Sequence, residues 1–199
     1  VGIIATLLAT ALGTVAALGL SRPHMPFKPV LMAILISPMI VPLIITAAGM
    51  FFFYSKIGLT HSYLGLILAH TALGTPFVVI TVTATLTGFD TNLIRASQSL
   101  GADTMRTFFK IIMPLILPGV ISGGLFAFIT SFDEVVVVMF IGSVEQITIP
   151  KQMWAGLRQE TSPVILCMAT CLVALSIALL TTVEMLRRRS ERLRGIKHR

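Results

Sequence analysis

Five long apolar stretches constrain this chain more than any other feature of its sequence. They cover residues 1–20, 30–54, 62–86, 115–141 and 163–186. A helix needs about 20 mainly apolar residues to cross the ~30 Å hydrocarbon core of a bilayer, so each stretch is long enough for one span. The backbone of a span must satisfy its own hydrogen bonds, which favours helices. The sequence therefore predicts an all-α, polytopic membrane helix bundle, with residues 1–199 forming a single transmembrane domain.

The composition agrees with a membrane environment. Of the 199 residues, 55% are hydrophobic and only 12% are charged, and the mean hydropathy is +0.94. Soluble domains carry roughly 25% charged residues, and a water-soluble fold of this size cannot hide so much apolar surface. We therefore expect membrane lipid to surround the chain.

Basic residues are distributed unequally between the two sides of the predicted bundle. One side holds 12 Lys and Arg residues and the other holds 3. The positive-inside rule places the richer side in the cytoplasm, so we expect a cytoplasmic C-terminus and an external Val1. A sixth span is then expected before Val1 in the full-length protein. The basic tail, residues 187–199, directly follows an apolar run, which favours a membrane-flanking anchor over a nucleic-acid site.

Prolines and one histidine interrupt the apolar stretches. Pro38 and Pro42 lie in the second stretch, and Pro76 lies in the third. Such prolines predict bends, which either reflect packing irregularity or line a cavity. His70, in the third stretch, either has a functional role or hydrogen-bonds to a neighbouring carbonyl.

The connection between the third and fourth stretches has the signals of two short helices. Asp90 or Asn92 can cap the first helix, and Gly101 suits the left-handed residue that ends it. Asp103 can cap the second helix, and Pro114 marks its end. This pattern predicts a compact helix–glycine–helix knob on the cytoplasmic side. The alternative is an amphipathic loop that lies flat on the bilayer.

The same connection resembles the signature of permease subunits of binding-protein-dependent ABC importers. That signature is Glu-Ala-Ala, three residues, Gly, nine residues, Ile, one residue and Leu-Pro. Every spacing fits this sequence, with Gly101 and Ile111 in place. Three residue types depart from the signature: Arg95 replaces the acid, Ser97 the second alanine and Met113 the leucine.

In that family the loop docks into a groove on a cytoplasmic ATPase. The resemblance therefore implies an ATPase-coupling loop over residues 87–114. Arg95 reverses the charge of the family's acid, whereas the helical knob and its glycine are retained. The implied site consists of eight residues: Arg95, Ala96, Ser97, Leu100, Gly101, Ala102, Ile111 and Pro114.

Other segments extend the resemblance over nearly the whole chain. Residues 37–42 are similar to the family's proline-flanked segment, and residues 131–137 resemble the polyamine (spermidine and putrescine) branch. The resemblance implies a transmembrane permease of the bacterial inner membrane that imports polyamines. Permeases for sulfate, iron or phosphonate in the same family are the alternatives.

The resemblance also implies partners that supply what this chain lacks. No Gly-Lys pair and no His-Glu-x-x-His motif occur, so the sequence has neither a Walker-type phosphate loop nor that zinc site. We expect no enzyme activity, cofactor or metal site here. The expected partners are a cytoplasmic ABC ATPase dimer, a second permease subunit in a heterodimer, a periplasmic solute-binding protein and lipid, without nucleic acid.

Asp133 and Glu134 are the acids expected within a span. An acid at the centre of a span costs roughly 2.5–3.5 kcal/mol on insertion scales, so we expect one acid to face the substrate pathway and the other to pair with a neighbouring group. The alternative is that both mark a helix end or bond to a partner subunit. Neighbouring acids on a helix point about 100° apart, which disfavours an intramembrane aspartyl enzyme; a membrane scaffold is the other rival class.

A stripe of small residues precedes these acids and predicts close helix packing. Its members recur every four residues: Gly119, Gly123, Ala127 and Ser131.

Overall fold

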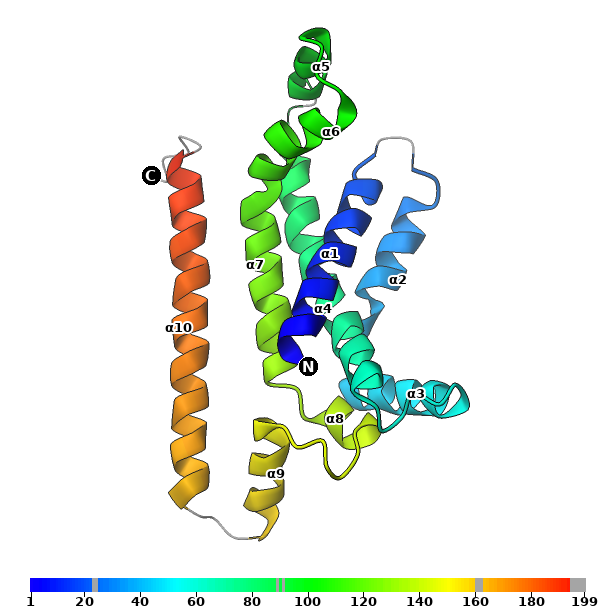
Figure 1. Ribbon diagram of the computed structural model, residues 1–199, viewed down its shortest axis with the longest axis vertical. Helices are drawn as coiled ribbons and strands as arrows, with labels where there is room; N and C mark the ends of the chain where they lie inside the picture. Colours follow the sequence, from blue (N-terminus) through cyan, green and yellow to red (C-terminus); the bar gives the residue numbers. More distant parts are fainter. Residues whose placement is uncertain (23–24, 89, 91, 160–162, 194–199) are drawn as a thin grey trace.

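The computed structural model describes residues 1–22, 25–88, 90, 92–159 and 163–193, and its regular structure in these ranges is helical (Figure 1). The predicted all-α fold is confirmed. The helices are α1 (Gly2–Leu20), α2 (Lys28–Ile40), α3 (Leu43–Lys56), α4 (Tyr63–Thr87), α5 (Asn92–Ser99), α6 (Thr104–Thr107), a π-helix (Phe108–Ile112), α7 (Met113–Phe132), α8 (Val136–Ile141), α9 (Ile149–Gln159) and α10 (Pro163–Leu193).

Four helices among the described residues are long and apolar enough to cross a membrane. They are α1, α4, the continuous helix Thr104–Phe132, and the Pro163–Thr182 part of α10. The bent pair of α2 and α3 brings the number of possible crossings to five. The five predicted apolar stretches therefore correspond to these five units.

The second stretch is a broken span, because α3 turns 105° away from α2. Val41, at the break, has an extended backbone with φ −70° and ψ 135°. The residue before a proline is driven out of the helical region, and Pro42 has no N–H to continue the hydrogen-bond ladder. The single continuous stretch expected over residues 30–54 is thus corrected to two helices. In contrast, α4 remains one helix through Pro76.

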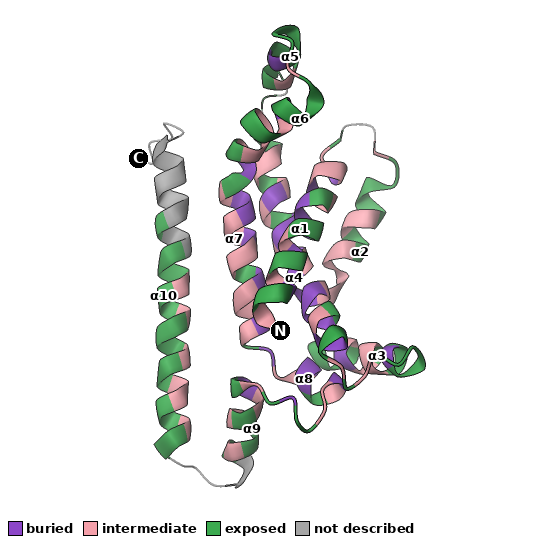
Figure 2. Ribbon diagram, in the orientation of Figure 1, coloured by how far each residue is buried: buried purple, intermediate pink, exposed green. Residues whose placement is uncertain are grey.

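The core of the bundle consists of α1, α4 and α7, which pack through small residues. Figure 2 shows the buried positions of these helices facing one another. A Cβ atom on Gly13 of α1 would lie 2.6 Å from Val78 Cβ of α4, so only glycine permits this approach. The predicted stripe on α7 is buried, which confirms close packing: Gly119, Gly123, Ala127 and Ser131. Helices in lipid associate mainly through such close contact.

The fourth stretch differs from the prediction at both ends. Pro114 does not end the preceding helix, because a π-helix joins α6 directly to α7 and Pro114 lies in the first turn of α7. A proline clashes with the carbonyl four residues earlier in a regular α-helix, and the wider π turn relieves this crowding. At the other end, α7 stops at Phe132 and a short break precedes α8.

Candidate functional site

The α5–α6 knob projects from one end of the bundle (Figure 1). Asp90 Oδ1 accepts a hydrogen bond from the Asn92 N–H (2.9 Å), so Asp90 rather than Asn92 supports the start of α5. Asp103 Oδ1 accepts one from the Arg106 N–H (2.8 Å) and caps α6 as predicted. The knob is therefore two capped helices rather than an irregular loop.

Gly101 reverses the chain between the two helices, with φ +80°. The Gly101 N–H donates to the Gln98 carbonyl (2.9 Å), and the Ala102 N–H donates to the Ser97 carbonyl (3.0 Å). This pair of bonds is the Schellman arrangement that ends helices at a left-handed glycine. A Cβ atom on Gly101 would have no neighbour within 4 Å, so the requirement for glycine comes from the backbone.

Ser97 lies inside the knob, at the position where the family signature has its second alanine. It is 6% exposed, and Thr107 on the facing helix is 3% exposed. Ser97 Oγ donates to the Ile94 carbonyl (2.9 Å) and lies 2.8 Å from Thr107 Oγ1. Because the Ser97 proton is used on Ile94, Thr107 is the donor to Ser97. A small residue is required here, and serine adds a hydrogen bond between α5 and α6.

The outer surface of the knob and of the π-helix that follows it carries large apolar side chains among exposed polar ones. Leu100, at the tip, is 88% exposed, and Met105 and Phe109 are 65% and 59% exposed. Of the other site residues that the sequence suggested, Arg95, Ala96 and Gly101 are exposed and Ala102 is half-buried. Ile111 and Pro114 lie apart from the tip, in the π-helix and in α7.

Asp133 and Glu134 occupy the break between α7 and α8. Asp133 is exposed and ends α7, with its N–H bonded to the Ile129 carbonyl (3.0 Å). Glu134 is 6% exposed, and its Oε1 accepts a hydrogen bond from the Val137 N–H (2.8 Å), which caps α8. Burial raises the pKa of the Glu134 carboxyl above its usual value, although hydrogen bonds from the backbone partly oppose this effect. Both acids thus mark a helix end.

Both acids also line one cavity of about 760 Å³. Its wall includes Ile44 of α3, Thr130 of α7, Phe140 of α8 and Trp154 of α9. The sequence had suggested that one acid faces a pathway and the other pairs elsewhere. In the structure both residues line the same space, and Glu134 also caps a helix.

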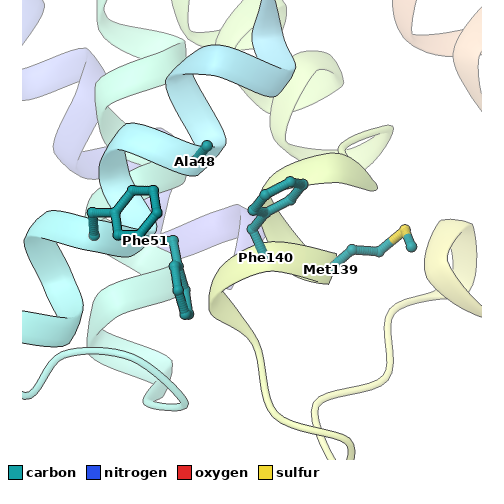
Figure 3. Close-up of a pocket in the computed structure, with 5 residues that line it drawn as sticks. Ala48, Phe51, Met139 and Phe140 are labelled. Carbon is teal, nitrogen blue, oxygen red and sulfur yellow. The ribbon is translucent and has the colours of Figure 1, made fainter.

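A second cavity, of about 400 Å³, has an aromatic lining, and Figure 3 shows the residues around it. It is lined by Ala48, Phe51 and Phe52 of α3 together with Met139 and Phe140 of α8. Met139 and Phe140 line both cavities, so the two spaces share a wall. Sequence reasoning missed these aromatic residues, although the run of aromatic residues from 51 to 54 near the end of α3 was a visible signal.

His70 joins α4 to the last turn of α7. It is 2% exposed, and its Nδ1 lies 2.7 Å from Ser131 Oγ. Its Nε2 atom is buried and has no hydrogen-bond partner among the described residues. The bond to Ser131 agrees with the structural alternative for this histidine, although the partner is a side-chain hydroxyl and not the carbonyl that we had expected.

Comparisons with known proteins agree on one family. Residues 9–192 match the family described as "binding-protein-dependent transport system inner membrane component". The chain is 31% identical over 186 residues to the spermidine/putrescine permease protein PotC of Haemophilus influenzae, covering 94% of this chain and 72% of that protein. It is 30% identical to PotC of Escherichia coli K12, with 90% and 68% covered.

Two solved structures share the fold. One is an inward-facing MetNI methionine ABC transporter, with a TM-score of 0.72 and 20% identity, covering 95% of this chain and 92% of that chain. The other is an amino acid ABC transporter with histidines, with a TM-score of 0.63 and 17% identity, covering 94% and 90%.

Proposed function

We propose a function from the premise that this chain belongs to the family of binding-protein-dependent transport system inner membrane components. It is accordingly a multi-pass inner-membrane permease subunit of an ABC importer and is not itself catalytic. A transporter of this kind also contains an ATPase, a solute-binding protein and a partner permease. The substrate, the coupling site and the orientation are the parts that we propose.

The proposed substrate is a polyamine such as putrescine or spermidine. The observation that carries this proposal is the position of Asp133 and Glu134 on the wall of one cavity. Carboxylates attract ammonium groups, and the aromatic faces of Trp154 and Phe140 offer further cation–π contacts. The permeases named for spermidine and putrescine in Haemophilus influenzae and Escherichia coli support the same assignment.

The chemistry of the cavity disfavours the alternative substrates. Two carboxyls on one wall would repel sulfate or a phosphonate. A metal ion such as iron is usually held by several nitrogen, oxygen or sulfur ligands, whereas the rest of this wall is mainly apolar and aromatic. An organic cation with methylene segments matches both parts of the wall.

The proposed coupling site is the exposed apolar surface of the α5–α6 knob, which would dock onto the ATPase. An apolar tip such as Leu100, outside the spans, typically marks a protein interface. The helix Thr104–Phe132 runs without interruption from the knob to Asp133. At 1.5 Å per residue its 29 residues extend about 43 Å, so a movement imposed on the knob reaches the acids directly.

The proposed orientation places the knob and the C-terminus in the cytoplasm, following the 12-to-3 distribution of basic residues. Two ATPase chains and a different permease chain would complete the transporter. A cysteine replacing Ser55 should react with an impermeant thiol reagent from outside intact cells, in a background where Cys167 and Cys171 are replaced. Reaction only after membrane disruption would reverse the proposed orientation.

The substrate proposal is tested by transport in proteoliposomes that contain the complete complex and its binding protein. ATP-dependent accumulation of labelled putrescine, spermidine, sulfate and a phosphonate would be measured in parallel. We expect accumulation of at least one polyamine and of neither anion. Accumulation of an anion without any polyamine would reject the assignment.

A further inference from the structure

The contact between α4 and α7 changes from apolar to polar in the last turn of α7. A Cβ atom on Gly74 of α4 would lie only 2.9 Å from Ala127 Cβ of α7, so small residues hold the helices together at this level. One turn nearer the end of α7, His70 and Ser131 meet instead, with Nδ1 2.7 Å from Oγ. Both residues are buried, at 2% and 7% exposure. The end of α7 is thus attached to α4 by a directional hydrogen bond.

This hydrogen bond constrains the end of α7 in a way that the small-residue contacts do not. A hydrogen bond weakens steeply when its length or angle changes, whereas apolar contact has no preferred direction. The bond between His70 and Ser131 therefore fixes the rotation of the last turn of α7, residues 129–132, about the helix axis.

The two acids follow Ser131 after one intervening residue. α7 ends at Phe132, and Asp133 and Glu134 come next and line the acidic cavity. The Asp133 N–H still donates to the Ile129 carbonyl of the last turn (3.0 Å). Because the acids are attached directly to this turn, a rotation of the turn would displace both of them relative to the cavity.

Filling space does not account for a histidine at position 70. The ring leaves Nε2 buried and without a hydrogen-bond partner among the described residues. A buried polar atom without a partner destabilises the folded protein. An aliphatic side chain would fill the same space without this cost, but it could not bond to Ser131.

We propose that His70 is a positioning residue for polyamine transfer, which acts by holding the last turn of α7 and thereby the pair Asp133 and Glu134 at the cavity. The proposal rests on the proposed function, because it assumes that these acids receive a polyamine. His70 acts through Ser131 and not by touching the substrate, since it is buried in the helix contact and is not among the residues that line the acidic cavity.

The test measures how many polyamine molecules are transported for each ATP hydrolysed. It uses the complete complex in proteoliposomes, with a saturating concentration of binding protein loaded with labelled putrescine or spermidine. A variant that is merely less stable contains less active complex, so its transport and its ATP hydrolysis fall together and the ratio stays the same. Displaced acids would instead reduce transfer while ATP hydrolysis continues, so the ratio would fall.

Two variants remove the hydrogen bond from opposite sides, and a third restores it. His70→Leu and Ser131→Ala should each lower the ratio by roughly two- to tenfold, the range expected for one hydrogen bond. His70→Asn places an amide close to the position of Nδ1, where it can still bond to Ser131, so it should retain most of the wild-type ratio.

The matched control is Thr81→Val, which affects the same pair of helices far from the acids. Thr81 Oγ1 of α4 donates to the Gly119 carbonyl of α7 (2.9 Å). Position 81 lies 11 residues from His70 along α4, about 16 Å at 1.5 Å per residue. Valine has nearly the shape of threonine but cannot donate this bond. The control should leave the ratio of transport to ATP hydrolysis unchanged.

Four results would overturn the proposal. The first is an unchanged ratio in the assembled His70→Leu and Ser131→Ala complexes. The second is an equal fall in Thr81→Val, and the third is a fall in His70→Asn as large as that in His70→Leu. The fourth is failure of both His70→Leu and Ser131→Ala to assemble, which would assign the pair to folding alone. A wild-type complex that transports another solute but no polyamine would instead reject the proposed substrate.

Discussion

Ser97 and Thr107 join the two helices of the knob through a hydrogen bond of 2.8 Å between their hydroxyl oxygens. Both side chains are buried, in a segment whose other surfaces are largely exposed. The knob has little apolar interior of its own, so this bond and the Gly101 turn are the main internal constraints on the angle between α5 and α6. That angle sets the shape of the surface around Leu100.

Ser97→Ala should weaken the association of the ATPase with this permease. The change leaves Thr107 Oγ1 buried without its partner, which costs about 1–3 kcal/mol. Removing both partners with Ser97→Ala and Thr107→Val together should recover part of the loss. The affinity of the detergent-solubilised permease pair for the ATPase is the measurement. Ser99→Ala is the control, because Ser99 is exposed and bonds only to the Arg95 carbonyl. An equal loss of affinity for the ATPase in Ser97→Ala and Ser99→Ala would show that the buried hydrogen bond is unimportant.

Gly101→Gln should uncouple transport from ATP hydrolysis while the permease still inserts into the membrane. The backbone at this residue has φ +80°, where an ordinary side chain costs roughly 1–2 kcal/mol. Because a Cβ atom would meet nothing within 4 Å, the cost is conformational and not steric. Gly101→Asn should therefore be milder, since asparagine tolerates the left-handed region better. Uptake and ATPase rates of the two variants would be compared. Normal uptake in Gly101→Gln with bound ATPase would remove the glycine from the coupling mechanism.

Local signals explain why the knob was predictable from the sequence. The caps of α5 and α6 and the left-handed turn depend on residues within a few positions of one another, and Asp90, Asp103 and Gly101 supply them. The apolar stretches likewise required only their length and composition. The end assigned at Pro114 was wrong because a proline is also tolerated in the first turn after a π-helix.

Long-range contacts explain why the cavities were not predictable. The end of α7 inside the apolar run 115–141 is a local exception, because the Glu134 carboxyl accepts from the Val137 N–H three residues later. Phe51 and Phe52 reach α8 only because α3 bends 105° from α2, which no local pattern specifies. Adjacent acids were visible in the sequence, whereas the aromatic wall beside them came from a segment some 80 residues earlier.

Asp133→Asn and Glu134→Gln should each lower uptake of putrescine or spermidine by roughly five- to thirtyfold, because loss of a charge facing a cation costs on the order of 1–2 kcal/mol. Glutamine can still accept the hydrogen bond from the Val137 N–H, so Glu134→Gln should assemble normally. Glu134→Ala loses the α8 cap and should also lower stability. Initial uptake rates in assembled complexes are the measurement. Unchanged uptake in both isosteric variants would exclude the acids from substrate transfer.

When the external medium is acidified, uptake should begin to fall at a higher pH than it would if Glu134 had the pKa of an ordinary exposed glutamate. Burial raises the pKa of Glu134, so its charge is lost at a higher pH as the medium becomes more acidic. The charged form that attracts the polyamine is present above this raised pKa and absent below it. In Glu134→Gln, the pH profile of uptake should lack the fall that protonation of Glu134 causes. The pH profile of ATP hydrolysis is the control. Identical uptake profiles in the wild type and Glu134→Gln would contradict the prediction.

Phe51→Leu and Phe140→Leu should reduce uptake of polyamines more than they reduce assembly of the complex. Both side chains line the aromatic cavity, and Phe140 also lines the acidic one, so a cation held at the acids has aromatic faces beside it. Leucine keeps an apolar side chain but removes the cation–π contact, which is worth about 0.5–2 kcal/mol. The substrate concentration for half-maximal uptake should therefore rise by roughly two- to thirtyfold. Phe53→Leu is the matched control, because Phe53 neighbours the cavity residues in sequence, is 60% exposed and does not line either cavity. The concentration dependence of spermidine uptake would be measured at saturating ATP. A larger effect at Phe53 than at Phe51 and Phe140 would show that the aromatic cavity takes no part in binding the substrate.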